Sequence, residues 1–444
     1  MRAPAILAMS CLAATTLRAQ DMQRVTLADA LRMAAQSQPT MVQARQSLRL
    51  AEAQERQTTA NFLPSVSTTA STSRSGGARA NQFGSPTTVQ GFYNSSIQLS
   101  ASLDLFTGFR RGAQRASARA VGDEAQATML SDSYTIALAT KQAFFAALAD
   151  SELVSVSQAQ LSLAQEQLNL VTQRLRLGAT TRADSLSASV AYGSAEVQLI
   201  QARANMRTAQ ANLGRAIGVD RLVDPVPDTT LEVRLGPLDT ATLRREALDN
   251  APAVVAADAA VAAARAQVRV NRAAYFPTVS IGASNSWLAG IQGVQDSTGG
   301  FIVPPTGTPF GGNYVSGWNV RLSVTLPLFN NLTRETNMVS SDATYQDAVA
   351  TARDTRLALD AQLTQSFAAL DAAAAQIDVS RTSVSAAEES LRLQNERYRL
   401  GAATFTDELN AQVALDQAEV NLVQARYNYL VARAQIEAYV GHGL

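Results

Sequence analysis

The stretch RLRLGATTRAD at residues 174–184 recurs as RYRLGAATFTD at residues 397–407, with seven of the eleven positions identical. Sequence rich in Ala, Gln, Leu and Arg, which favours helix, surrounds both copies. Gly178 and Gly401 each follow a turn that contains arginine, in the position where a left-handed residue ends a helix. Each copy therefore predicts a tight turn between two helices, that is, an antiparallel helical hairpin.

The residues after each glycine predict the start of the second helix. Thr181 and Thr404 are N-cap candidates, and Asp184 and Asp407 lie three residues further along. Helix capping explains both aspartates, and an additional role as pore-lining groups stays open. In that role, carboxylates from several chains would converge and repel one another, which would raise some of their pKa values and attract cations.

Other segments repeat in the same order. FLPSVS at residues 62–67 matches FPTVS at 276–280, with the two prolines 213 positions apart, and LDLF at 103–106 matches LPLF at 326–329, 223 positions later. The change in spacing falls in the loops between these segments. The predicted organisation is a tandem duplication, with a first repeat at residues 21–218, a linker at 219–240 and a second repeat at 241–444.

Each repeat is expected to contain helices, a strand, a loop, a second strand, one very long helix, a turn and a final helix. The segment 110–177 has no proline and would span about 100 Å as a helix, so it must pack in a coiled coil or bundle. The expected elements are strands at about 62–72, 94–106, 276–287 and 314–328, long helices at 110–177 and 332–400, and final helices at 181–217 and 404–440.

Two of the expected strands alternate clearly between apolar and polar residues. Residues 97–103 read IQLSASL, and residues 318–326 read WNVRLSVTL. Segments of about ten residues with one apolar and one polar side are typical of transmembrane barrel strands. The loops at 73–93 and 288–313, rich in Gly, Pro, Ser and Asn, suit the extracellular side of such a barrel.

Four strands cannot close a membrane barrel, which needs at least about eight. Because an open sheet edge is not tolerated in lipid, the chain is expected to oligomerise, as two copies or three. The alternative is a soluble antiparallel sheet with one face on a core. The absence of any predicted helical layer over the sheet, together with the N-terminal segment described next, favours the barrel.

The first twenty residues predict a signal peptide at 1–20. Arg2 supplies its positive end, an apolar run follows, and Leu17 and Ala19 flank a small-residue cleavage site. Lipid attachment at Cys11 is the alternative. Beyond this segment we expect no helix apolar enough to cross a membrane.

The composition excludes several classes of function. Lys and Arg number 37, as do Asp and Glu, so the chain lacks the basic surplus of a nucleic-acid-binding protein. Cys11 is the only cysteine and His442 the only histidine, which excludes a disulfide framework or a His-cluster metal site within one chain. The sequence therefore predicts a protein that is not an enzyme and has no bound metal or cofactor.

Together these features resemble the TolC-like outer-membrane efflux channels, also called outer membrane factors. TLADAL at residues 26–31 with Pro39, the LxLF strand ends, both RLGA turns and QARYNY at 424–429 carry the resemblance. It extends over essentially the whole mature chain.

The resemblance implies a mostly α fold with a membrane β part. The protein would be a homotrimer with a 12-strand β-barrel in the lipid of the outer membrane, four strands per chain, continued by a long α-helical coiled-coil barrel across the periplasm. It would act as the passive channel of a tripartite efflux pump or a type I secretion system. Its partners would be a periplasmic adaptor (membrane fusion) protein and an inner-membrane pump of the resistance-nodulation-division (RND) or ABC type.

The resemblance also implies sites at the hairpin tips. A periplasmic gate would be lined by Asp184, Asp407, Asn410 and Tyr398. Asn410 stands where the family often has a second acidic residue, and Ala403 replaces the arginine that latches the gate in some members. The residues expected to contact the adaptor are Gly178, Ala179, Thr180, Thr181, Gly401, Ala402, Ala403 and Thr404.

A function from another class stays open at this point. The chain would then be a periplasmic or surface coiled-coil scaffold without a conduit, and its strands would form a small soluble sheet. Detergent dependence separates the two hypotheses, because only a barrel needs detergent. The sequence does not distinguish a drug, a metal ion, a peptide or a protein as the substrate.

Overall fold

The computed structural model describes residues 23–80, 86–227, 239–289, 294–295, 301–302, 310 and 314–443. The predicted signal peptide, Cys11 and residues 228–238 of the predicted linker lie outside this part. Contacts divide the chain into two units. The helical unit comprises Met1–Arg45, Met129–Val254 and Arg356–Leu444, and the sheet unit comprises Gln46–Thr128 and Val255–Thr355.

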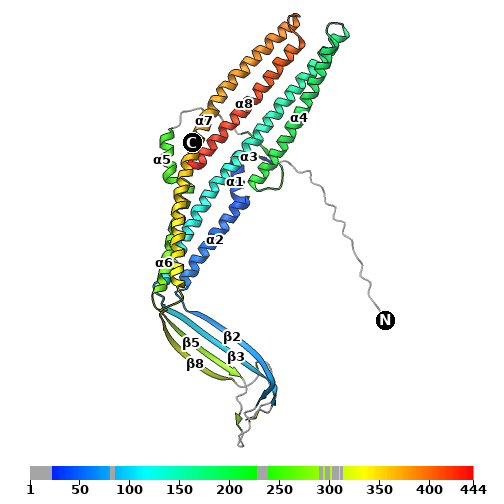
Figure 1. Ribbon diagram of the computed structural model, residues 1–444. Helices are drawn as coiled ribbons and strands as arrows, with labels where there is room; N and C mark the ends of the chain where they lie inside the picture. The colour runs from blue at the N-terminus through cyan, green and yellow to red at the C-terminus, as the bar shows by residue number, and fades with distance from the viewer. Residues whose placement is uncertain are drawn as a thin grey trace, which may run out of the picture. The chain divides into compact units, whose positions relative to one another are not determined.

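The first half of the chain contains β1 (Gln23–Val25), α1 (Leu27–Ser37), α2 (Pro39–Ala60), β2 (Ser65–Ala80), β3 (Pro86–Phe106), α3 (Arg110–Arg176), α4 (Arg182–Ile217) and β4 (Val223–Pro225) (Figure 1). The second half contains α5 (Thr240–Asn250), α6 (Pro252–Arg272), the short 3-10 helix η1 (Ala273–Tyr275), β5 (Thr278–Ala289), β6 (Val294–Gln295), β7 (Phe301–Ile302), β8 (Val315–Thr325), α7 (Thr333–Arg399) and α8 (Phe405–Val440).

The two halves have closely matching helices. α3 and α7 each have 67 residues, and α4 and α8 each have 36. The shorter helices α1 and α5 both have 11 residues. This correspondence agrees with the repeat seen in the sequence, and its origin in a tandem duplication stays a prediction.

Two large apolar clusters form most of the core of the helical unit in the described chain. Phe144 of α3 and Leu213 of α4 are fully buried in the first cluster. Leu363 of α7 and Ile436 of α8 are fully buried in the second. Between α3 and α8, the Lys141 ammonium pairs with a carboxylate of α8, and further polar contacts join the same two helices. The long helices are therefore held by packing against one another, as their length requires.

One helical segment of the described chain, Thr240–Tyr275, is long and apolar enough in composition to cross a membrane. The expectation that no such helix follows the N-terminal segment is therefore wrong. Alanine supplies most of its apolar character, and the helix breaks at Ala251, which has extended backbone between α5 and α6. Ala247, Ala251 and Val254 are buried against residues of α7 and α8. The small side chains at this break thus serve close helix packing in the helical unit.

The sheet unit contains four antiparallel strands in the order β2-β3-β5-β8. Leu103 of β3 lies opposite Ile281 of β5, which lies opposite Leu322 of β8. Because directly opposed residues share a face of the sheet, the apolar sides of these strands join into one continuous surface. On β8 the side chains of Trp318, Val320, Leu322 and Val324 on this surface are 56–81% exposed.

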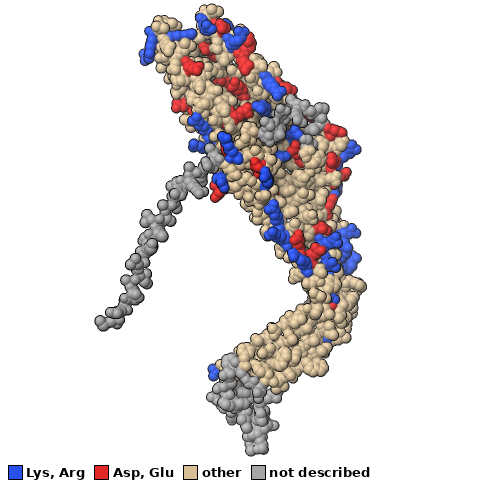
Figure 2. Space-filling model, turned by 180° about the vertical axis from the view of Figure 1, so that it is seen from behind, with Lys and Arg blue, Asp and Glu red and all other residues tan. Residues whose placement is uncertain are grey.

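The opposite face of the sheet is lined by hydroxyl groups. Ser65 and Ser102, Ser67 and Ser100, and Ser71 and Ser96 form hydroxyl–hydroxyl hydrogen bonds of 2.7, 2.8 and 2.8 Å between β2 and β3. The row continues across β5 and β8 with serine and asparagine. Figure 2 shows almost no charged side chains on the described part of the sheet, whereas the helices carry both signs of charge.

The strands β2 and β3 extend beyond their expected ends. The loop expected at residues 73–93 is strand except for residues 81–85, which lie outside the described chain. Backbone pairing continues here through sequence rich in Ser, Thr and Gly, with a bulge between Ser75 and Gly77. Such sequence lacks the apolar alternation by which a strand is recognised, which is why its strand structure was missed. In the loop expected at 288–313, β5 reaches Ala289 and β6 pairs with β7, and the remaining residues up to 313 lie, apart from Phe310, outside the described chain.

The buried leucine of α7 provides a test of the helical core. We expect Leu363→Ala to lower the free energy of unfolding by about 2–5 kcal/mol, because the truncation leaves a cavity between α7 and α8. The exposed neighbour Gln362 is the control. Gln362→Ala is expected to change the free energy of unfolding by no more than about 0.5 kcal/mol. Urea unfolding followed by circular dichroism measures both. Equal effects of the two substitutions would contradict this core.

Candidate functional site: the two hairpin tips

The first hairpin tip, residues 174–184, ends α3 with a left-handed glycine. Gly178 has φ +72°, and its N–H donates to the Leu175 carbonyl at 3.0 Å. The Ala179 N–H donates to the Arg174 carbonyl at 2.9 Å, which completes a Schellman motif. The second tip, residues 397–407, repeats both bonds, and its glycine has φ +73°. Both turns are therefore fixed by the same backbone geometry.

A capping box starts the second helix of each hairpin. The Thr181 hydroxyl accepts the Asp184 N–H at 3.1 Å, and the Asp184 carboxylate accepts the Thr181 N–H at 3.1 Å. Thr404 and Asp407 make the same two bonds at 3.2 and 2.8 Å. The structure thus gives both aspartates the capping role that their spacing indicates.

Around the capping aspartate, the two tips differ by one hydroxyl group. Thr180 donates to the Asp184 carboxylate at 2.7 Å, whereas Ala403 occupies the matching position beside Asp407. Hydrogen bonds from the threonine side chains lower the pKa of Asp184, and the Thr404 peptide N–H, followed by its hydroxyl, lowers the pKa of Asp407. Both carboxyls are ionised at neutral pH. Their stabilisation is complete above the ordinary aspartate pKa and is lost as the pH falls through the lowered values.

Tyr398 lies in a small apolar cluster that joins the two hairpins. Its ring centroid is 5.9 Å from that of Phe405, which is buried against Val171 of α3 and Ala188 of α4. The Arg174 guanidinium lies 5.3 Å from the centre of the Tyr398 ring, in a cation–π arrangement. In this chain the arginine that contacts the tyrosine therefore comes from the other hairpin.

The remaining predicted gate position lies near this cluster in sequence. Asn410 lies one turn beyond Asp407, and both side chains are exposed. Asp184 in the other hairpin is half-buried. Burial raises the pKa of the neighbouring Glu408 carboxyl, and the Arg174 charge opposes that rise. A role of Asp184, Asp407, Asn410 and Tyr398 in lining a gate depends on neighbouring subunits and stays a prediction.

The predicted adaptor-contact residues are mainly exposed at the ends of the hairpins. The leucine that precedes each glycine is also exposed there, and it was not predicted from the sequence. Leu177 is 83% exposed and Leu400 is 82% exposed. An apolar side chain of this size that projects into solvent is informative when the same position recurs in both hairpins. The recurrence in both RLGA turns was the available signal.

A groove between α3, α4 and α8 lies beside the tips in the helical unit. It contains a cavity of about 450 Å³ lined in part by Gln160, Gln412 and Asp416. Gln412, 8% exposed, donates to Asp416 at 2.8 Å. Within the described chain the other amide atom of Gln412 and the amide nitrogen of Gln160 are buried and have no hydrogen-bond partner. Burial raises the pKa of Asp416.

In the described residues no group of three or more His, Cys, Asp or Glu side chains is arranged to hold a metal.

The N-cap of α8 provides a test of the tip geometry. We expect Thr404→Ala to weaken the first turn of α8 by about 1 kcal/mol, because a hydroxyl acceptor and its capping box are lost. Hydrogen exchange of the Asp407 and Glu408 amides should then become about fivefold faster. Thr406→Ala, at an exposed position in the same turn, is the control. Equal protection in the two variants would contradict the cap.

The chain was compared with known proteins at three levels. A family model described as outer membrane efflux protein matches residues 30–219 and 243–442. The outer membrane protein TolC of Escherichia coli (strain K12) is 24% identical over 355 residues, which cover 78% of this chain and 69% of TolC. The pyoverdine export outer membrane protein OpmQ of Pseudomonas aeruginosa is 25% identical over 351 residues, which cover 78% and 70% of the two chains.

The fold has close structural neighbours as well. The Campylobacter jejuni CmeC outer membrane channel superposes with a TM-score of 0.75 at 18% identity, over 94% of this chain and 86% of that one. At this identity the likeness shows the fold alone, and it agrees with the four-stranded sheet and long helices described above. The family model covers most of the chain in two stretches. The chain therefore belongs to the outer membrane efflux protein family.

Proposed function

We propose that three copies of this chain form a passive export duct of a tripartite efflux or type I secretion system. The chain is a TolC-like protein of the outer membrane that extends into the periplasm. Each subunit contributes four strands to a 12-strand barrel, and the helices form the wall of a periplasmic tunnel. An adaptor protein binds the hairpin tips, and an inner-membrane RND or ABC pump supplies the energy. The duct has no catalytic role and no cofactor.

The continuous apolar face of the sheet carries this proposal. It spans β3, β5 and β8 and is solvated in a single chain, which is unfavourable in water and favourable in a bilayer. In the described chain β2 and β8 have no strand beyond them. Their free N–H and C=O groups require partners in lipid, and neighbouring copies provide them. The number three comes from the family resemblance.

The exposed tips support an adaptor contact. Leu177 and Leu400 present two equivalent apolar side chains next to rigid Schellman turns. A rigid backbone with a projecting leucine suits a protein contact, because little conformational freedom is lost on binding. The name of the related OpmQ refers to export of pyoverdine. For the chain described here, we propose that the inner-membrane pump selects the substrate.

The lipid-facing side of the barrel can be tested with one residue on each face of β8. Val320→Arg is expected to reduce the amount of folded protein in the outer membrane by at least tenfold, because an arginine on the lipid face costs about 2–4 kcal/mol per subunit. Asn319→Arg places the same charge on the polar face and is expected to assemble. Membrane fractionation measures both variants. Equal accumulation would contradict a barrel with this orientation.

The gate residues can be tested by channel conductance. The double variant Asp184→Asn, Asp407→Asn is expected to have lower cation selectivity, because up to six carboxylates would be neutralised in a trimer. The asparagine amide oxygen can still accept the N–H of the N-cap threonine, so the hairpins should still fold. Asp378→Asn, on the exposed surface of α7, is the control. Reversal potentials in planar bilayers provide the measurement, and unchanged selectivity in the double variant would reject a pore-lining role.

A further inference from the structure

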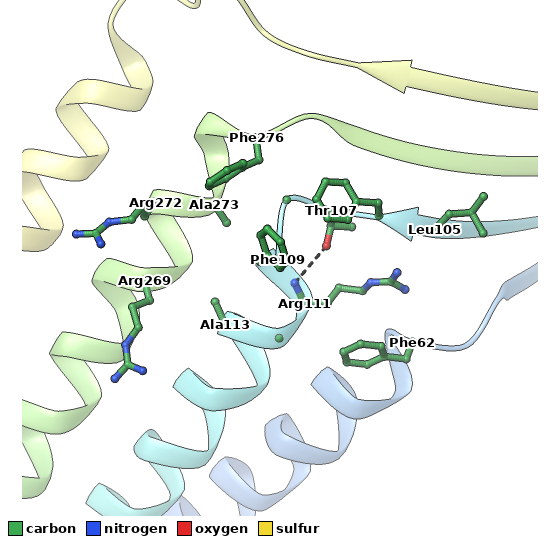
Figure 3. A pocket seen from close by; sticks show the side chains of 13 residues that line it. Phe62, Leu105, Thr107, Phe109, Arg111, Ala113, Arg269, Arg272, Ala273 and Phe276 are labelled. Atoms are coloured by element: carbon green, nitrogen blue, oxygen red, sulfur yellow. Dashed lines mark hydrogen bonds between the residues drawn. The ribbon is translucent and has the colours of Figure 1, made fainter.

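A second cavity lies in the sheet unit, where the strands meet the helices. Its volume is about 590 Å³, and its walls include Phe62, Phe106, Phe109 and Phe276. In Figure 3 Phe109 projects between Ala113 of α3 and Ala273 of η1. We call this cavity, together with its aromatic walls, the aromatic hollow. It is far from the hairpin tips in sequence, and none of the roles proposed above uses it.

The rings of the aromatic hollow form a connected series. Phe106 and Phe109 lie edge to face with centroids 5.3 Å apart, and Phe109 and Phe276 do the same at 5.8 Å. Phe109 has φ +67°, a conformation that bulky residues rarely adopt, and it remains 69% exposed. Gly108 must be glycine here, because a Cβ atom would lie 2.6 Å from the Cβ of Phe276. A strained backbone therefore holds a large apolar ring at the surface.

The hollow continues the apolar face of the sheet. Without a break in the register Phe106 would fall on the polar side, because it follows Asp104 by two residues. A bulge at Leu105 shifts the pairing, so that Asp104 lies opposite Ser280 and Phe106 lies opposite Val279. Val279 lies on the apolar face, opposite Val324. Phe106 thus starts the aromatic series on the side of the sheet that a bilayer would contact.

Arginine dominates the charge around the aromatic hollow. The helix ends next to the strands, residues 53–64, 107–119, 265–276 and 333–342, contain nine arginines and three carboxylate side chains. Figure 2 shows basic side chains, with some acidic ones among them, at the ends of the helices beside the nearly uncharged sheet. Arg269 and Arg272 of α6 line one side of the hollow, and Arg111 lies on the other side of Phe109 (Figure 3).

Within the described chain, the hydrogen bonds of Arg111 go to uncharged acceptors. Its guanidinium donates to the carbonyl oxygens of Asn61 and Asp104 and lies 5.0 Å from the centre of the Phe62 ring. Carbonyl oxygens do not neutralise the guanidinium, so Arg111 adds positive charge beside the apolar walls. A charge of this kind next to an apolar surface suits an anionic amphiphile.

Neighbouring subunits would not cover this place. Copies of the chain would pair with the outer edges of β2 and β8, whereas the aromatic series starts on β3 and reaches the start of β5, in the middle of the sheet. The apolar face at the centre of the sheet has no protein partner in such an assembly. The group that meets it there is lipid.

We propose that the aromatic hollow binds an anionic glycerophospholipid, with its phosphate at Arg269 and Arg272 and an acyl chain against Phe106 and Phe109. The inference rests on the proposed barrel, since it places the sheet in a bilayer and the helix ends at its periplasmic surface. Guanidinium groups bind phosphate oxygens through two parallel hydrogen bonds, and aromatic rings pack on the chain below the headgroup. The site fixes the depth of the barrel in the inner leaflet.

Lipid retention by the purified assembly tests the headgroup part of the proposal. The mature protein in detergent is titrated with dioleoyl phosphatidylglycerol, and bound lipid is counted by native mass spectrometry. Arg269→Gln with Arg272→Gln is expected to weaken binding by about 25-fold, since each arginine near an anionic headgroup contributes about fivefold. The matched control removes two exposed arginines of α7, Arg381→Gln with Arg392→Gln, and should bind as the unmodified protein does.

Chain length and free phosphate separate a lipid site from a phosphate site. Phe109→Asn tolerates the left-handed backbone and is expected to reduce the advantage of the dioleoyl lipid over a dihexanoyl lipid with the same headgroup. Inorganic phosphate at the same concentration should not displace the lipid. Displacement by phosphate, or equal binding of phosphatidylcholine, would overturn the proposal.

The proposed barrel is checked on the same samples. Channels that conduct but bind phosphatidylglycerol equally in both double variants would reject the lipid site alone. Protein that stays monomeric and stable without detergent would reject the barrel, and with it the reason for a lipid site.

Discussion

The unpaired backbone at the two edges of a four-stranded sheet is the constraint on which the rest of the structure depends. Each chain carries an apolar face that needs a bilayer and edge strands that a bilayer does not tolerate unpaired. In the proposed barrel, closure with other copies would satisfy both requirements at once. The hydroxyl-lined face would then lie inside, where paired serines on β2 and β3 offer a polar surface without charge.

The long helices likewise depend on contacts with other parts of the structure. A helix of 67 residues has no core of its own, and each of these two is held by apolar contacts with other helices. At the hairpin tips the backbone is fixed locally by Schellman turns and capping boxes, and the two hairpins are joined by the contact of Arg174 with Tyr398. Firm local geometry of this kind would suit the proposed gate, in which each hairpin moves as a unit.

Local signals in the sequence predicted much of this fold. The left-handed glycines and the Thr–Asp spacing predicted both tips, and the alternation at 97–103 and 318–326 predicted the paired faces of β3 and β8. The extension of β2 could not be predicted in this way, because its serine and threonine residues have no apolar period and pair mainly through the backbone. The bulge at Leu105 was also missed, because a bulge depends on the partner strand, here β5.

Side-chain contacts between distant segments were likewise beyond the sequence. Tyr398 was expected at a gate, and it lies against Phe405 and Arg174 in the chain itself. The exposure of Leu177 and Leu400 depends on how the hairpins end in space, which periodicity does not describe. Residue roles that depend on other subunits stay predictions for the same reason, since one chain does not contain the neighbours.

The most direct test of this account is electron microscopy of the mature protein extracted and purified in detergent. A trimeric barrel predicts particles with three-fold symmetry, a barrel at one end surrounded by detergent, and loss of the assembly when detergent is removed. A two-fold particle would contradict the trimer, and a rod or globule that is stable without detergent would contradict the barrel itself.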